Sequence, residues 1–231
     1  RSVERGEQPE CPPRRPGQPG QSQSPVECFT ILAAAVFYQE CPAISPQYLQ
    51  GSEVLEPGER QFTPYISYVS FVFNGDSEHL QTQVGMQTAF GINPSADMRL
   101  SYTRATIADI DYGYNILTFG PKFRIGSSAL HVPVGFFLGD DVETSESLYT
   151  NPTLYFTGRI NDLVRLNFGG MVRLPIDDGF FSDAAGGINL GFSLGSGESI
   201  ELRPEANMIF DLGDGDGYFW SAGMGVTVKL P

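Results

Sequence analysis

The two histidines are the residues best suited to acid–base chemistry in this chain, because histidine titrates near neutral pH. His79 follows Glu78 and lies near Asp76, so a histidine–carboxylate pair could form there. His131 lies close to a short turn, and we interpret it as a polar residue of the interior. No nucleophile motif accompanies either histidine. We therefore predict that the protein is not an enzyme and uses no cofactor, with a hydrolase as the alternative.

Acidic residues gather in segments without lysine or arginine, namely 74–79, 108–113, 139–149, 175–185 and 211–217. The acids that could bind a cation are Asp140, Asp141, Glu143, Asp177, Asp178, Asp211, Asp214 and Asp216. Ca²⁺ prefers carboxylate oxygens, so divalent cations are candidate partners. Solvated loops are the simpler interpretation. A twelve-residue calcium loop from Asp214 would place Gly225 where a glutamate is required, and the Asp-Gly pairs suit hairpin turns.

Ten segments in which apolar residues alternate with small or polar ones must position these groups. Such alternation with a period of two residues is typical of β-strands. They cover 61–73, 80–92, 98–107, 114–125, 129–138, 150–160, 163–174, 186–194, 199–210 and 218–230. One face is apolar, and the other carries Gly, Ala, Ser, Thr and nearly all strand-borne charge. The alternation is clean in most segments, and the first segment is apolar on both faces. Each segment is long enough to cross a hydrocarbon layer, which takes about 9–11 residues.

The connections between these segments alternate in length. Those at 93–97, 126–128, 161–162 and 195–198 are short, whereas the acidic ones between them are mostly longer. No apolar run reaches 18 residues, so a membrane would have to be crossed by strands. Lipid tolerates no unpaired sheet edge, and an even count of ten strands permits antiparallel closure.

In these features the chain resembles the small outer-membrane β-barrels of Gram-negative bacteria, over about residues 60–231. The resemblance implies an all-β fold, a closed antiparallel up-and-down transmembrane β-barrel of about ten strands. It also implies a place in the cell outer membrane, contact with outer-membrane lipid, and a structural or narrow, porin-like passage role. Some such barrels are hydrolases, which is the enzymatic alternative. The chain ends in Leu230-Pro231, whereas such proteins often end in Phe.

Two other functions remain open from sequence. The first is a surface interaction protein that uses its aromatic and acidic loops, with Tyr112, Tyr149, Phe180 and Phe181. The second is a soluble, lipocalin-like calyx that binds an apolar ligand inside. A net charge of −13 argues against nucleic acid as a partner.

Most of the bases lie near the short connections or the C-terminus. By alternation they face inward with two acids, and the expected layer comprises Arg99, Lys122, Arg124, Arg159, Arg165, Glu201, Arg203, Glu205 and Lys229. Buried charges must pair or meet water. The layer is therefore either a plug of ion pairs or the basic constriction of a narrow pore with an acidic mouth. By strict alternation Arg104 falls on the apolar face, and a β-bulge or an earlier end of the strand would remove this exception.

The chain before the barrel divides into three parts. Residues 1–27 are rich in Pro, Gly, Gln and Ser and are predicted to be disordered. Residues 28–41 resemble a signal segment that ends at Cys41, a candidate for lipidation, although Gln39 and Glu40 stand where small residues are expected. Residues 42–60 are predicted to be a linker to the barrel at 61–231.

Overall fold

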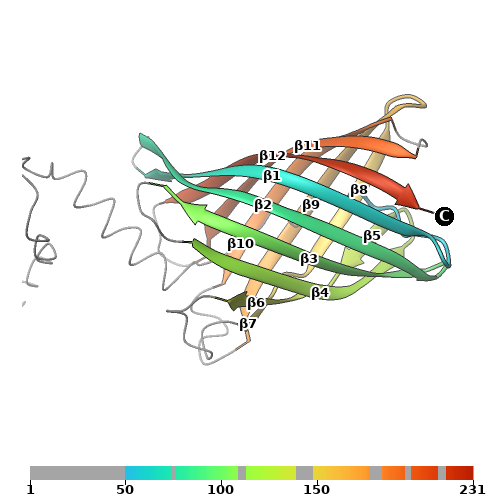
Figure 1. Cartoon of the computed structure of the whole chain (residues 1–231), viewed down its shortest axis with the longest axis horizontal. Coiled ribbons are helices and arrows are strands. Elements are labelled where there is room, and N and C mark those ends of the chain that lie inside the picture. The colour runs from blue at the N-terminus through green and yellow to red at the C-terminus, as the bar shows by residue number, and fades with distance from the viewer. Residues whose placement is uncertain are drawn as a thin grey trace, which may run out of the picture. The chain divides into compact units, whose positions relative to one another are not determined.

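The computed structural model describes residues 50–73, 76–108, 113–138, 148–176, 184–195, 199–212 and 217–230. Every regular element in these ranges is a β-strand, and the strands form one sheet that closes on itself (Figure 1). The strands are β1 Arg60–Phe73, β2 Asp76–Asn93, β3 Ala96–Ile107, β4 Gly113–Ile125, β5 Ser128–His131, β6 Val134–Leu138, β7 Leu148–Thr150, β8 Thr153–Arg159, β9 Val164–Pro175, β10 Ala185–Leu194, β11 Ile200–Asp211 and β12 Tyr218–Leu230. The described residues include no helix of the length and hydropathy needed to span a membrane.

Two strands of the barrel are each interrupted at a proline. β5 and β6 both pair with β4, and β7 and β8 both pair with β9, so each pair is one strand in two pieces. The breaks fall at Pro133 and Pro152, because proline has no N–H for the sheet. Gly120 of β4 faces the first break, where an added Cβ would lie 2.3 Å from the Val132 carbonyl. The closed antiparallel up-and-down barrel of ten strands that the sequence predicts is confirmed.

The pairing of β12 with β1 closes the barrel, with Leu230 opposite Arg60. The strands are staggered around the barrel, as the paired residues show when they are followed from Tyr68 of β1. Through β2 and β3 the pairing reaches Gly113 of β4, whereas in the other direction, through β12 to β8 and β5, it reaches Ile125 of the same strand. This stagger tilts the strands steeply against the barrel axis, as closure requires. The architecture is a closed, tilted antiparallel barrel.

The connections between strands lie at the two ends of the barrel. Residues 94–95, 126–127, 160–163 and 195–199 join strands at the end where β1 begins and β12 finishes, which we call the short-turn end (marked C in Figure 1). The opposite, loop end carries the acidic connections. The connection expected at 74–79 is only residues 74–75, because β2 already begins at Asp76, opposite Phe73. Its acids Asp76 and Glu78 therefore belong to β2 and not to a loop.

Of the eight proposed cation-binding acids, only Asp211 lies within the described residues. Asp211 is the last residue of β11. The other acids, Asp140, Asp141, Glu143, Asp177, Asp178, Asp214 and Asp216, lie outside the described residues, as do Cys41 and all of 1–49.

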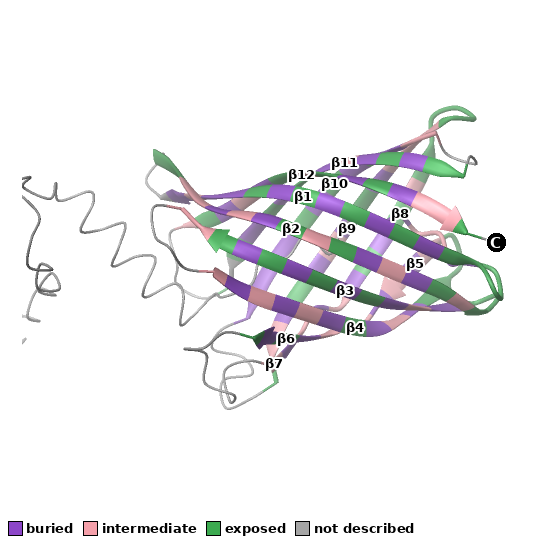
Figure 2. Cartoon of the chain, in the orientation of Figure 1, coloured by how far each residue is buried: buried purple, intermediate pink, exposed green. Residues whose placement is uncertain are grey.

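Exposed and buried residues alternate along the strands (Figure 2). Large apolar side chains cover the outside of the barrel, and most of the buried residues are polar or charged. Phe168 and Leu190 are 44% and 48% exposed, whereas their chain neighbours Asn167 and Asn189 are buried. A water-soluble barrel would have the reverse arrangement. This arrangement is the one expected of a barrel wall that faces hydrocarbon.

The first strand owes its ambiguous pattern to a bulge. The register of β1 against β2 shifts between Val69 and Ser70, so these consecutive residues are both buried inside the barrel. Arg104 of β3 has no such explanation. The pairing Val84–Arg104–Asn115 is regular and β3 continues to Ile107, so the expected bulge or early strand end is wrong and Arg104 is exposed on the outer wall.

Candidate functional site: a strap inside the barrel

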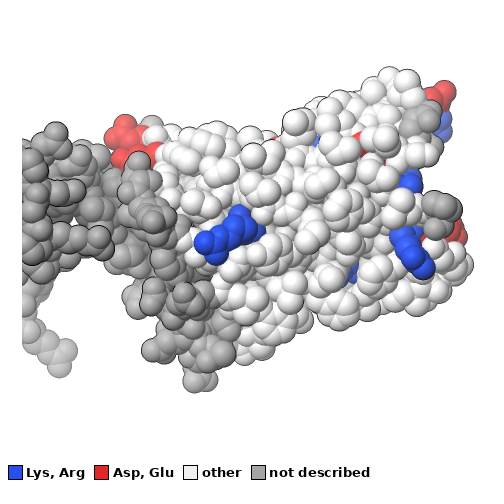
Figure 3. Space-filling view, in the orientation of Figure 1, with Lys and Arg blue, Asp and Glu red and all other residues white. Residues whose placement is uncertain are grey.

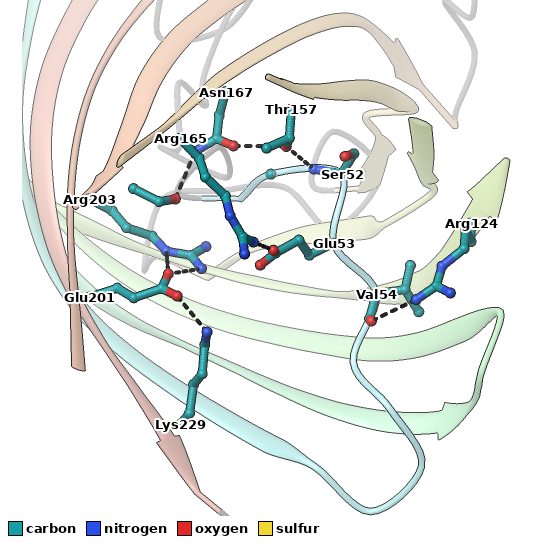
Figure 4. Close-up of polar contacts among 12 residues, drawn as sticks. Ser52, Glu53, Val54, Arg124, Thr157, Arg165, Asn167, Glu201, Arg203 and Lys229 are labelled. Atoms are coloured by element: carbon teal, nitrogen blue, oxygen red, sulfur yellow. Dashed lines mark hydrogen bonds and ion pairs between the residues drawn. The ribbon is translucent and has the colours of Figure 1, made fainter. Parts of the chain in front are cut away.

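Residues 50–59, which we call the strap, enter the short-turn end of the barrel, with residues 50–55 inside it and residues 56–59 exposed (Figure 4). Gly58, with a φ of 88°, and the Glu59 N–H bonded to the Glu56 carbonyl at 3.0 Å turn the chain inward from the start of β1. Gln50 at the inner end of the strap is 1% exposed. The strap is therefore a part of the lumen, in a region that the sequence predicted only as a linker.

Cations of the inner wall hold the strap by its backbone. The Lys122 ammonium donates to the Gly51 carbonyl and, at 2.9 Å, to the Glu53 carbonyl. Arg99 also donates to the Glu53 carbonyl at 3.3 Å, and Arg124 donates to the Val54 carbonyl at 3.3 Å. Charged donors make the stronger class of hydrogen bond. Three side chains of β3 and β4 thus hold three carbonyl groups of the strap, those of residues 51, 53 and 54.

Carboxylates complete the charge balance of this contact. Asp97, fully buried, accepts from Arg99 at 2.8 and 2.9 Å and from the Leu55 N–H at 3.1 Å. Glu53 of the strap forms an ion pair with Arg165 of β9. Buried cations near the strap thus have acidic or carbonyl partners, as a low-dielectric interior requires.

A chain of hydrogen bonds ties the strap to the opposite wall. The Ser52 N–H donates to Thr157 Oγ1 at 2.7 Å, and that hydroxyl donates to Asn167 Oδ1 at 2.9 Å. Asn167 then donates to Ser193 Oγ at 2.9 Å, which extends the network across β8, β9 and β10 (Figure 4). A Cβ on Gly51 would lie only 2.4 Å from Asn167 Oδ1, so the strap approaches this wall closely.

A second charged cluster joins β11 to β12. Glu201, 1% exposed, accepts from Arg203 at 2.7 Å and forms an ion pair with Lys229. Glu205 lies on the same inner face and accepts from Asn207 at 3.1 Å.

The structure places the nine residues of the expected layer as follows. Arg99, Lys122, Arg124 and Arg165 contact the strap, and Glu201, Arg203, Glu205 and Lys229 lie together on β11 and β12. Arg159 does not join them, because it is exposed and pairs with Asp162 in the turn after β8.

The lumen beyond the strap is occupied by aromatic side chains. Tyr149 is buried, and the Arg173 guanidinium lies 4.6 Å from the centroid of its ring. A Cβ on Gly135 would lie 2.1 Å from the Tyr149 ring, so glycine makes room for the tyrosine. A Cβ on Gly85 would likewise lie 2.6 Å from the Tyr65 ring, so Gly85 makes room for Tyr65. These contacts narrow the interior between the strap and the loop end.

The two histidines do not sit in a recognisable catalytic arrangement. The His79 ring stacks on Tyr68 with centroids 3.9 Å apart, and its Nε2 lies 3.3 Å from Thr82 Oγ1. His131 is buried on the inner wall opposite Lys122. Within the described ranges, no group of three or more His, Cys, Asp or Glu is placed to hold a metal ion.

No protein-family model and no curated protein matches the chain. Solved structures with similar folds include the translocator domain of the autotransporter NalP from Neisseria meningitidis, with a TM-score of 0.49 and 10% identity over 76% of this chain and 90% of that one. An outer membrane channel from Pseudomonas putida F1 has a TM-score of 0.41 and 10% identity, over 81% and 100%. Ail of Yersinia pestis has a TM-score of 0.36 and 11% identity, over 75% and 99%. Each is a likeness of general architecture.

Proposed function

We propose that this protein is a non-enzymatic outer-membrane β-barrel protein whose lumen is a narrow passage held shut by its own strap. The apolar wall and the closed sheet support a bilayer location, because lipid tolerates neither exposed polar groups nor open strand edges. The polar inner wall disfavours a calyx for an apolar ligand. The loops that a surface interaction protein would use lie largely outside the described residues.

The observation that carries the proposal is the way in which the strap is held. Its attachment to Lys122, Arg99 and Arg165 is entirely non-covalent, through hydrogen bonds and one ion pair. Hydrogen bonds to charged groups contribute about 1.5–3 kcal/mol each, so a few of them give a closed state that can still open. In this closed state the strap binds the same cationic side chains that would form the basic constriction if the pore were empty.

Location is tested by fractionation. Outer-membrane vesicles should contain the full chain, its extraction should need detergent, and its gel migration should change on heating. A chain that is soluble without detergent would contradict the membrane assignment.

Passage is tested by ionic current through planar bilayers. In the double variant Lys122→Met/Arg165→Met, the strap loses the Lys122 bonds to the Gly51 and Glu53 carbonyl groups and the Arg165–Glu53 ion pair, and it keeps the Arg99 bond to the Glu53 carbonyl. The fraction of time spent open should therefore rise at least roughly tenfold. Arg159→Met removes a cation from the same end that pairs only with Asp162 in the turn, and it should leave the current unchanged. If the double variant is heat-modifiable and carries wild-type current, the strap does not gate a passage.

A further inference from the structure

Arg104 is a charged residue on the apolar outer wall of β3. The face of the wall seen in Figure 3 carries little charge between the two ends of the barrel. Arginine at the middle of a bilayer costs about 2–4 kcal/mol on such a wall, falling to about 0–1 kcal/mol near the interface. A charge here therefore needs a location near the membrane surface and a partner.

The guanidinium of Arg104 reaches the loop-end rim. It lies over Gly113, the first residue of β4, where an added Cβ would be 2.9 Å from Arg104 Nη2. Long basic side chains commonly extend in this way toward the headgroup region. Outer-membrane barrels have short periplasmic turns and longer outer loops. In a bilayer crossed by these strands, the loop end would therefore face outward and the charge of Arg104 would lie at the level of the outer-leaflet headgroups.

Neutral groups hold the guanidinium in place. Arg104 Nη1 donates to Asn115 Oδ1 at 3.4 Å, and the same oxygen accepts from the Tyr102 hydroxyl at 2.7 Å. Asn115 donates in turn to the Leu138 carbonyl at 3.5 Å. Across the described ranges, Arg104 has no carboxylate within ion-pair distance, and most of its five N–H donors remain available to a ligand on the outside.

We propose that Arg104, with Tyr102 and Asn115, binds a phosphate group of an anionic lipid in the outer leaflet. Guanidinium and phosphate match in charge and in paired hydrogen-bond geometry, and the surrounding apolar wall accommodates acyl chains. The proposal rests on the membrane location proposed above. It does not depend on whether the lumen conducts.

The test is a titration of lipid A into the full-length protein in micelles of a neutral detergent. At each lipid concentration, gel electrophoresis measures the temperature at which the heat-modifiable band of the folded protein is lost. Lipid A should raise this temperature for the wild type. Arg104→Gln should need a roughly tenfold higher lipid concentration for the same rise. Arg159→Gln, an exposed arginine already paired in a turn at the other end, should respond like the wild type.

Two further arms identify the ligand. Dephosphorylated lipid A should give little rise, and inorganic phosphate should give none. Equal responses of the wild type and Arg104→Gln to lipid A, or an equal response to inorganic phosphate, would overturn the lipid site and leave the membrane barrel intact. A wild-type chain that is not heat-modifiable at all would overturn the membrane assignment and this site together.

Discussion

Gly91 of β2 faces the strap so closely that any side chain there should displace it. An added Cβ would lie 1.8 Å from the Glu56 carbonyl oxygen and 2.9 Å from that of Leu55. Because contacts below 3.0 Å essentially never occur, Gly91→Leu forces the strap to move by more than about 1 Å. We predict that this substitution opens the short-turn end.

The size of the effect follows from the bonds that are lost. The movement disrupts the bond from Gly58 N–H to the Gly91 carbonyl at 3.2 Å and the bond from Gly91 N–H to the Glu59 carbonyl at 2.9 Å. Two backbone hydrogen bonds and the overpacking together destabilise the closed strap by about 3 kcal/mol. This should raise the open fraction roughly a hundredfold.

The assay is single-channel current in planar bilayers, combined with cleavage by a glutamate-specific protease at Glu53. Gly91→Leu should show more frequent openings and faster cleavage. Gly170→Leu is the matched control, because a Cβ at Gly170 meets nothing within 4 Å. A folded Gly91→Leu protein with wild-type current and wild-type protection at Glu53 would refute the reasoning.

Two further predictions concern the wall and the buried charges, and both are measured by urea unfolding in lipid vesicles. Phe168→Arg should destabilise the barrel by about 2–4 kcal/mol, and Ile176→Arg at the loop end by only about 0–1 kcal/mol; equal costs would contradict a bilayer around the wall. Glu201→Gln should cost about 3–5 kcal/mol because it takes the carboxylate from Arg203 and Lys229, and Glu201→Met/Arg203→Met should recover most of this. A double variant no more stable than Glu201→Gln would contradict the second prediction.

The strands and their faces could be predicted because they depend on a local pattern. The segment expected at 163–174 is β9, Val164–Pro175, and its apolar Phe168 is on the outside as alternation requires. The inward direction of Arg203 follows from the same alternation. Where a residue's face depends on the neighbouring strand, the pattern failed, and Val69 and Ser70 face inward together because of a bulge against β2.

The strap could not be predicted from the sequence, because most of its contacts with the barrel wall involve its backbone and not particular side chains. Lys122, Arg99 and Arg124 bind carbonyl groups, which every residue of a chain possesses. Asp97 was assigned to a turn, although its spacing of two residues from Arg99 indicates a shared inner face that could have been recognised. The partner of Arg165 could not be identified, since Glu53 is distant in sequence and lies in an apparent linker.

The position of the strap is tested most directly by a disulfide between Gly51→Cys and Thr157→Cys, with Cys11, Cys28 and Cys41 replaced by Ser. A Cβ at Gly51 would lie 2.6 Å from Thr157 Oγ1, an atom that Thr157→Cys removes, so residues 51 and 157 are close enough for a disulfide. The other near atom, Asn167 Oδ1 at 2.4 Å, is the end of a side chain and can shift, unlike the backbone that Gly91 meets. Mild oxidation of the full chain in membranes should join the two cysteines, whereas Gly51→Cys with Gly170→Cys should stay reduced. If residues 51 and 157 also stay reduced and both react freely with maleimide, the strap does not occupy the lumen.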